Sequence, residues 1–361
     1  MSTAARLLRV DLRDFTGYSS ARSGTSLRGD AWLNANESPT PSSTDADGLL
    51  RRYPDPQPQA LRDALAALYG VDSAQVLATR GSDEGIDLLL RAFCAPGQGA
   101  IVTAPPVFGM YAVCAKLHGA CVIEVPARDS LEGWRSDLDA MADAAISEGA
   151  TLVFVCNPGN PTGEAIGNDA IECLARRLVG KALVVVDAAY AEFAEADAGA
   201  SLLAGNDNLV ILRTLSKAHA LAGARIGSVL ASPELIGMLK RCQAPYPLAQ
   251  PAVEAALVAL AVEPLARAQA NAMQARGERE RLRVGLQAAP GVHGVYPSQG
   301  NFLLVRFDDA PRAFDGLLDA GIVVRDMRAT PGLEDALRIS IGTPEQNQRV
   351  LATLARQRQA A

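Results

Sequence analysis

The feature that most constrains this chain is a succession of short apolar runs, rich in β-branched residues, that each end in polar or turn residues. Seven such runs follow one another, at 75–81, 99–106, 119–127, 150–158, 181–190, 208–217 and 224–232. Segments with apolar residues at helical spacing lie between them, as in "PQALRDALAALYG" and "SDEGIDLLLRAF", where we expect Ser82 to cap the helix. Continuous apolar runs that alternate with helices are typical of buried, mostly parallel strands with helices on both faces. We therefore predict an α/β fold built on such a sheet.

The pattern changes on either side of this region. The first 50 residues are rich in Gly, Ser, Thr, Asn and Pro, which is typical of an extended arm. After "APYPLAQP" a long helical pattern leads to three short strands, "NFLLVRF", "GIVVRDM" and "ALRISIG". The chain then closes with a helix for which Thr343, Pro344 and Gln346 predict a capping box. We expect an arm at 1–50, a large domain at 51–245, and a smaller α+β domain at 246–361.

Charge and composition exclude several classes of partner. A net charge of −6 and a pI near 5.3 argue against nucleic acid and anionic membranes as partners. No apolar stretch is long enough to span a bilayer, and the first residues lack the apolar core of a signal peptide. The cysteines form no C-x-x-C pair and the histidines no H-x-x-x-H pair, so we expect no metal site. The sequence thus predicts a cytoplasmic protein with small-molecule partners.

Chemically versatile residues gather where the predicted strands end. In a parallel α/β sheet, ligands bind beyond the carboxyl ends of the strands. These ends carry Gly81-Ser82, the loop "NPGNPTG", the turn "DAAY" and the pair Ser216-Lys217. Most basic residues of this chain are arginines, which cannot lose a proton and so cannot act as amine nucleophiles. Lys217 at a strand end therefore indicates amine chemistry, although each of these groups taken alone could be structural.

Three of these segments identify a family. "NPTG", "DAAY" and "LSKAHALAGARIG" resemble the signature blocks of the fold-type I aminotransferases, which use pyridoxal 5'-phosphate (PLP). Flanking segments, among them "GYSSARS", "WLNANESP", "RRYPDP", "PPVFGMY" and "APYPL", are similar to those of the histidinol-phosphate aminotransferases within that family. The resemblance extends from about Gly17 to the last helix. It implies a large PLP-binding domain with a mostly parallel central sheet and a smaller α+β C-terminal domain.

The resemblance implies a role for each residue around the cofactor ring. Lys217 would hold PLP as a Schiff base and carry a proton to and from the substrate. Asp187 would pair with the pyridine nitrogen and keep it protonated. Tyr190 and Asn160 would donate hydrogen bonds to the phenolic oxygen of the ring. Phe108 would stack on the ring face, where many relatives carry tyrosine.

The phosphate of PLP would be held at the other end of the site. The resemblance assigns this contact to Ser216, to Arg225, and to Gly81, Ser82 and Asp83 at the start of a helix. A helix N-terminus favours anions, and a guanidinium fork matches the geometry of phosphate oxygens. In the family, the tyrosine of "RYP" reaches the phosphate from the neighbouring subunit. Tyr53 therefore implies a homodimer with shared active sites, in which the arm packs on the small domain and on the partner subunit.

Substrate recognition would fall to Tyr18, Arg325 and Arg338, with Tyr18 contributed by the partner subunit. The resemblance implies transfer of an amino group between L-histidinol phosphate and 2-oxoglutarate. One substrate carries a phosphate ester where glutamate carries its α-carboxylate, and an arginine fork can bind either anion. His219 stands where many relatives have an aromatic residue, and we expect a packed, uncharged ring there.

Other activities fit the cofactor residues equally well. An aromatic amino-acid aminotransferase or a phosphothreonine decarboxylase would share all of them and differ only around the substrate. A non-catalytic regulator of the same fold would carry an added DNA-binding domain and a basic patch, and this sequence has neither. A nucleotide-binding enzyme is disfavoured because neither G-x-G-x-x-G nor G-x-x-x-x-G-K-[ST] occurs.

Overall fold

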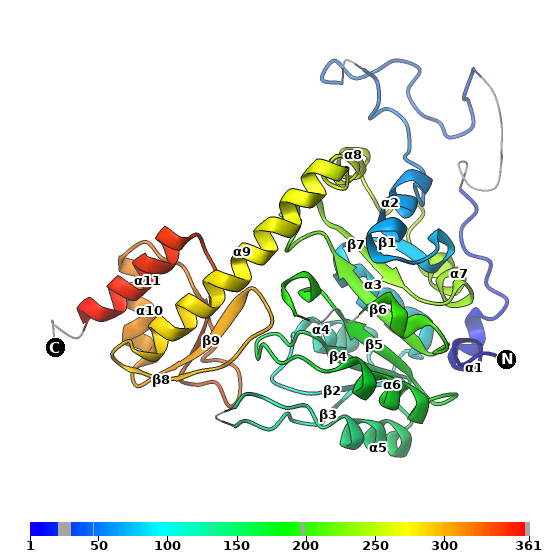
Figure 1. Cartoon of the computed structure of the whole chain (residues 1–361). Coiled ribbons are helices and arrows are strands. Elements are labelled where there is room, and N and C mark those ends of the chain that lie inside the picture. Colours follow the sequence, from blue (N-terminus) through cyan, green and yellow to red (C-terminus); the bar gives the residue numbers. More distant parts are fainter. Residues whose placement is uncertain (21–29, 46, 131, 196–198, 358–361) are drawn as a thin grey trace.

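The computed structural model of the chain describes residues 1–20, 30–45, 47–130, 132–195 and 199–357. They form two sheets that lie side by side, and helix α9 runs from α8, beside the larger sheet's domain, to the smaller sheet (Figure 1). The predicted segment "GYSSARS" and the predicted arm lie partly outside the described residues. In the described part of the chain, no helix combines the length and the apolarity that crossing a membrane requires.

The larger sheet has the strand order β1-β7-β6-β5-β4-β2-β3. Strands β6, β5, β4, β2 and β3 pair in parallel, whereas β7 is antiparallel to both of its neighbours. This confirms the mostly parallel central sheet predicted from the apolar runs. The strands are β1 (Val76–Arg80), β2 (Ala100–Thr103), β3 (Cys121–Glu124), β4 (Leu152–Cys156), β5 (Leu183–Asp187), β6 (Leu209–Thr214) and β7 (Ile226–Leu230).

Helices cover both faces of this sheet because its strands are apolar on both sides. One face packs against α2, α5, α6 and α8, and the other packs against α1, α3, α4 and α7. These helices are α1 (Thr3–Leu7), α2 (Gln59–Tyr69), α3 (Gly81–Phe93), α4 (Met110–His118), α5 (Leu138–Glu148), α6 (Asn168–Arg177), α7 (Pro233–Cys242) and α8 (Gln250–Ala259). Gly70 ends α2 in the left-handed conformation, as its position after the apolar pattern predicts.

The smaller sheet is antiparallel, with the order β10-β11-β9-β8. Helices α9, α10 and α11 supply the apolar side chains that cover one of its faces. The elements are α9 (Val262–Gln287), β8 (Val292–Val295), β9 (Phe302–Phe307), α10 (Ala310–Asp319), β10 (Arg325–Asp326), β11 (Ala336–Ser340) and α11 (Pro344–Gln357). The capping box is confirmed, since Thr343 and Gln346 exchange two hydrogen bonds with each other's backbone.

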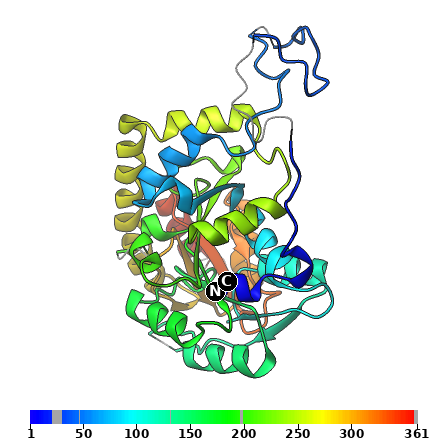
Figure 2. The same cartoon turned by 90° about the vertical axis from the view of Figure 1, so that its right-hand side faces the viewer.

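The start of the chain differs from the expected arm. Residues 3–7 form a helix, and Ala4 and Leu8 are buried among residues of α3, α4 and α7. Thr3 also binds Asp207 through its backbone N–H and its hydroxyl, both at 2.9 Å. This first segment therefore packs against the larger sheet, and our expectation that it packs on the small domain was wrong. By contrast, the described residues from about 30 to 56 extend away from the body of the chain (Figure 2).

Candidate active site

The strand directions explain how distant residues meet at one edge of the larger sheet. The carboxyl ends of β4, β5 and β6 lie side by side, since these strands are parallel neighbours. Strand β7 runs the other way, so Arg225, which precedes it, reaches the same edge. Arg80 pairs with Ile226 in the β1–β7 ladder, which places Gly81 beside Arg225.

A cavity of about 140 Å³ opens at this edge. It is lined by Ser82, Asp83, Phe108, Cys156, Asn160, Asp187, Ala189, Tyr190, Thr214, Ser216, Lys217, Ala222 and Arg225. Most of the residues that we predict from the sequence to bind the cofactor therefore line this one cavity. Among the described residues, Gly81 lies next to the cavity through its contact with Arg225, whereas Tyr18, Tyr53, Arg325 and Arg338 are not part of its lining.

Asp187 is the last residue of β5 and is almost completely buried, with 3% of its surface exposed. The hydroxyl of Tyr111 donates a 2.8 Å hydrogen bond to its Oδ2, and the backbone N–H of Ala189 donates to its Oδ1 at 3.2 Å. Burial raises the pKa of Asp187 to about 6, although both hydrogen bonds act in the opposite direction. A buried carboxylate of this kind is suited to a cationic partner, such as a protonated ring nitrogen.

Lys217 lies three residues after β6 and lines the cavity. Its Nζ lies 5.5 Å from the centroid of the Tyr190 ring. Burial lowers the pKa of the Lys217 ammonium, and the positive charge of Arg338 lowers it further. Both effects favour the neutral amine, which is the form that attacks a carbonyl carbon.

The opposite end of the cavity is a cradle for an anion. It lies at the start of the 13-residue helix α3, where Ser82 is buried and Gly81 has φ +71°. The guanidinium of Arg225 lies against Gly81 so closely that a Cβ at this position would come within 2.5 Å of its Nη2. Nη1 of Arg225 donates to Ser216 Oγ at 3.3 Å, and Nη2 pairs with Asp83 at 3.1 Å. Free helix N–H groups and a guanidinium together fit a phosphate group.

Our sequence-based expectation that Ser82 caps α3 was wrong. The helix begins one residue earlier, at Gly81, and Arg80 occupies the cap position without a side-chain hydrogen bond. Glycine at φ +71° allows this abrupt entry from β1, which leaves the Ser82 hydroxyl facing the cavity.

Asn160 connects the cavity to the smaller sheet. Its Nδ2 donates to the Tyr190 hydroxyl at 3.4 Å, and its Oδ1 accepts a hydrogen bond from Nη1 of Arg338. The Arg338 guanidinium lies 5.3 Å from the Phe302 ring centroid. Its Nε is buried without a hydrogen-bond partner among the described residues. Arg338 can therefore donate a further hydrogen bond to an anion that binds beside this cavity.

The remaining predicted residues lie farther from the cavity. Arg325 pairs with Arg338 in the β10–β11 ladder but is exposed. Tyr18 and Tyr53 are exposed, and Tyr53 stacks on Tyr246 with the ring centroids 4.5 Å apart. His219 is packed as expected, and burial lowers its pKa, which favours the uncharged ring.

Sequence reasoning missed Tyr111, a fully buried residue that donates a hydrogen bond to the cavity residue Asp187. Its ring stacks on Phe154 and meets Phe108 edge to face. Phe108 lies two residues before α4 and Tyr111 is the second residue of that helix, so no helical spacing in the sequence marks this pair. Cys156 and Thr214 also line the cavity, next to predicted residues in the chain.

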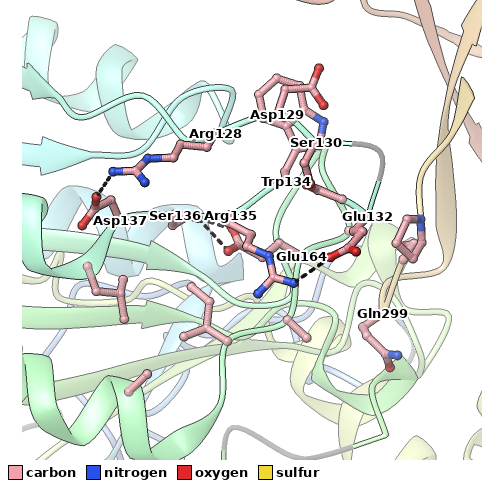
Figure 3. A pocket seen from close by; sticks show the side chains of 18 of the residues that line it. Arg128, Asp129, Ser130, Glu132, Trp134, Arg135, Ser136, Asp137, Glu164 and Gln299 are labelled. Carbon is pink, nitrogen blue, oxygen red and sulfur yellow. Dashed lines mark hydrogen bonds and ion pairs between the residues drawn. The ribbon is translucent and has the colours of Figure 1, made fainter.

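A larger groove, of about 970 Å³, is lined by residues within 128–139, 163–174 and 297–299 (Figure 3). Many of its charged groups pair with one another. Arg128 pairs with Asp137 at 2.7 Å, and Arg135 pairs with Glu132 at 3.6 Å (Figure 3). We assign no chemistry to this groove, because these pairs leave little charge for a ligand.

Comparison with known proteins identifies the family of this fold. The family model for "Aminotransferase class I and II" matches residues 23–354. Histidinol-phosphate aminotransferase of Stenotrophomonas maltophilia (strain R551-3) is 59% identical over 355 residues, which cover 98% of this chain and 97% of that protein. The protein of the same name from Xanthomonas euvesicatoria pv. vesicatoria (strain 85-10) is 55% identical and covers 99% of each chain.

Solved structures show the same fold. The crystal structure of histidinol-phosphate aminotransferase from Sinorhizobium meliloti, in complex with pyridoxal-5'-phosphate, superposes with a TM-score of 0.79 at 27% identity, covering 91% of this chain and 90% of that one. L-threonine-O-3-phosphate decarboxylase from Porphyromonas gingivalis superposes with a TM-score of 0.71 at 23% identity, covering 86% and 92%. The fold is therefore shared by enzymes that carry out different reactions.

Proposed function

This chain belongs to the family of class I and II aminotransferases, and we propose that it moves an amino group from L-histidinol phosphate to 2-oxoglutarate with PLP as cofactor. The products are imidazole acetol phosphate and L-glutamate, and the reaction is a step of L-histidine biosynthesis. The observation that carries the proposal is that the amine of Lys217 lies 5.5 Å from the centroid of the Tyr190 ring, while Arg338 donates to Asn160, which in turn donates to the Tyr190 hydroxyl. The name of the substrate comes from relatives of 55–59% identity over nearly the whole chain.

The residues of the cavity fit PLP from end to end. The α3 N-terminus, Ser216 and Arg225 would hold its phosphate, and Asp83 would help to orient Arg225. Asp187 would bind the ring nitrogen, with Tyr111 fixing the position of the carboxylate. When bound, PLP supplies an electron-withdrawing ring that eases loss of the substrate Cα proton.

Lys217 would transfer the proton in the reaction. Its amine would first anchor the cofactor and then, once released by the incoming substrate amine, carry a proton to and from the substrate Cα. The lowered pKa of Lys217 suits this task, because a base must be neutral to accept a proton. Phe108 would cover one face of the ring, and Tyr190 with Asn160 would bind its phenolic oxygen.

One anion site serves both half-reactions. Arg338 would bind the phosphate ester of histidinol phosphate and, in the other half-reaction, the α-carboxylate of glutamate. Its buried, unpartnered Nε supports this role, since a buried donor without an acceptor is costly. Arg325, next to it in the ladder, would add positive charge at the entrance.

We propose further that two copies of the chain form a cytoplasmic homodimer with shared active sites. Tyr18 and Tyr53 are exposed and do not line the cavity of their own chain within the described ranges. The described residues from about 30 to 56 extend from the body, as a segment that contacts a second copy would (Figure 2). Tyr53 would then reach the partner's phosphate cradle, and Tyr18 the partner's substrate.

An assay with three amino donors tests the reaction. The purified protein, with PLP and 2-oxoglutarate, should form glutamate from L-histidinol phosphate much faster than from phenylalanine. With phosphothreonine it should release no CO₂. Faster transfer from phenylalanine would identify an aromatic amino-acid aminotransferase, and CO₂ release would identify a decarboxylase.

A further inference from the structure

A buried arginine outside the cavity joins the two sheets. Arg279 lies in α9, the long helix that leads from α8 to the smaller sheet (Figure 1). Only 7% of its surface is exposed. Its Nη1 donates to the backbone oxygen of Phe193 at 3.0 Å and to that of Gly300 at 2.9 Å. One guanidinium nitrogen thus bridges the turn after β5, in the larger sheet, and the segment before β9, in the smaller sheet.

Burying a positive charge at this position has a high cost in free energy. Both oxygens that Arg279 binds are neutral carbonyls, and an apolar side chain of similar volume would avoid the loss of hydration. Burial also lowers the pKa of the Arg279 guanidinium, as expected for a cation removed from water. The two hydrogen bonds, rather than the packing of the side chain, set Arg279 apart from an apolar residue here.

The two carbonyls belong to segments that carry active-site residues. Phe193 ends the short helical turn (Ala191–Phe193) that directly follows Tyr190. Gly300 precedes Phe302 by two residues, and the Phe302 ring meets the Tyr190 ring edge-on at 5.1 Å. The guanidinium of Arg338 also lies over the Phe302 ring, 5.3 Å from its centroid. By binding both segments, Arg279 fixes the turn that follows Tyr190 relative to β9, the strand whose Phe302 ring lies beside Arg338.

The same segment of the smaller sheet also holds the Asn160 loop. The backbone N–H of Gln299 donates to the oxygen of Gly163 at 2.9 Å, and its side-chain Oε1 accepts from the N–H of Glu195 at 3.0 Å. Gly163 has φ +75°, and a Cβ there would lie 2.5 Å from Cβ of Ser298. Gln299 lies at the edge of the groove, next to this contact (Figure 3). Residues 298–302 thus contact the loop after β4, which carries Asn160, and the turn after β5, which carries Tyr190.

We propose that Arg279 is a positioning residue that sets the distance between the cofactor contacts, Tyr190 and Asn160, and the anion-binding Arg338. The inference rests on the proposed function, because it concerns the geometry of that site. By tying Phe193 to Gly300, Arg279 holds the reacting end of the substrate at a fixed place relative to Lys217. A displacement of about 1 Å in such a site can lower the rate about a hundredfold.

The test compares Arg279→Met, Arg279→Lys and a matched control on the same helix. Arg276, one turn earlier, donates to the oxygen of Glu192 at 2.9 Å and so holds the turn alone. Each purified holoenzyme is assayed for kcat and KM with histidinol phosphate and with glutamate. The urea midpoint reports folding, and a pH titration of the absorption band of bound PLP reports the surroundings of the ring oxygen that Tyr190 contacts.

We expect Arg279→Met to fold and bind PLP fully, but to lose about ten- to a hundredfold in kcat/KM with both donors. The midpoint of its PLP band should shift, because Tyr190 moves. Arg279→Lys should recover part of both effects, since an ammonium can also donate to two carbonyls. Arg276→Met should change kcat/KM less than roughly threefold, because it leaves the bridge between the two sheets intact.

Three results would overturn the proposal. The first is a folded Arg279→Met protein with normal kcat/KM and a normal PLP band. The second is an equal loss in Arg276→Met, which would assign the effect to the turn alone. The third is a lysine variant that recovers nothing. If the unaltered protein does not transaminate histidinol phosphate, the proposed function fails, and the PLP titration still decides the role of Arg279.

Discussion

The guanidinium of Arg338, on β11 of the smaller sheet, donates a hydrogen bond to the side-chain oxygen of Asn160, on the loop after β4 of the larger sheet. Asn160 in turn donates to the hydroxyl of Tyr190 at 3.4 Å. A chain of hydrogen bonds thus leads from the expected substrate site to the expected cofactor site. The two sites share Asn160, so a change in one affects the other.

Replacing Arg338 should reduce activity with both substrates. Arg338→Gln removes a charged, forked contact, which costs about 2–5 kcal/mol. This corresponds to a loss in kcat/KM of roughly 30-fold to several thousandfold, for histidinol phosphate and glutamate alike. Arg338→Lys should recover little, because a point charge cannot reproduce the fork. Steady-state kinetics with both donors and the absorption spectrum of bound PLP are the measurements.

A structural role for Arg338 predicts a different result. If its main task were to hold Asn160, both variants would bind PLP weakly or unfold at lower urea concentration. Full activity toward both substrates would also exclude Arg338 as the anion site. Arg349→Gln serves as the control, because Arg349 is an exposed arginine of α11 in the same domain and has no predicted role in the site.

The succession of strands along the chain and the chemistry at their ends could be predicted from the sequence, whereas the order of the strands in the sheet and the contacts made by long side chains could not. Apolar runs place Asp187 and Lys217 at strand ends because the runs stop there. The bond from Tyr111 to Asp187 depends on the packing of α4 against the sheet, which no local pattern specifies. The same holds for the Arg279 bridge, whose partners are backbone oxygens distant in the sequence.

The start of the chain shows a second limit of local reasoning. Composition favours an extended arm, but Ala4 and Leu8 fill an apolar site on the larger sheet and Thr3 binds Asp207. A short segment of this kind gains its order from burial against distant residues, which composition does not report.

Borohydride reduction should place the pyridoxyl group on Lys217. Its Nζ lies in the cavity, and burial lowers its pKa toward the reactive neutral form. Peptide mapping by mass spectrometry of the reduced holoenzyme identifies the labelled lysine. A label on Lys116, Lys181 or Lys240 would contradict the assignment.

Hybrid dimers should recover activity that neither parent has. A Lys217→Ala protein keeps an intact Tyr53, and a Tyr53→Ala protein keeps an intact Lys217. If Tyr53 acts on the partner's cofactor, a mixed dimer contains one site with both residues and should regain up to half of the unaltered activity per such dimer. Dimers must be mixed under conditions that exchange subunits and then isolated by two different affinity tags. Inactive hybrids would show that each site is built within one chain.

Asp187 should make the PLP-free protein less stable as pH rises. Its folded pKa of about 6 lies above the ordinary value of 3.8, so the folded state holds the proton more tightly than the unfolded state. The contribution of Asp187 to stability is therefore greatest below about pH 4 and falls as pH rises to about 6, by no more than about 3 kcal/mol. Asp187→Asn lacks this titration, so the difference in urea midpoint between the two PLP-free proteins should change over this window. A difference that stays constant from pH 4 to 7 would contradict the prediction.

Replacing Ala220 by glycine should stabilise the protein without loss of activity. Ala220 has φ +56°, a left-handed conformation that costs a residue with a Cβ about 1–2 kcal/mol. It lies in the turn between Lys217 and Leu221, where its N–H binds the oxygen of Lys217 at 3.1 Å. Glycine adopts this conformation freely but loses more entropy on folding, so the expected net gain is about 0.5–1 kcal/mol.

Arg225 also has a left-handed backbone, but replacing it by glycine should have a different effect from Ala220→Gly. It also has a positive φ, of +57°, but its guanidinium binds Ser216 and Asp83 in the anion cradle. Strain at Arg225 is therefore coupled to a function, whereas the methyl group of Ala220 supplies no hydrogen bond. Ala220→Gly should raise the urea midpoint of the holoenzyme and leave kcat unchanged, while Arg225→Gly should weaken PLP binding. A drop in kcat for Ala220→Gly at higher stability would show that the strained turn holds Lys217 in its working position.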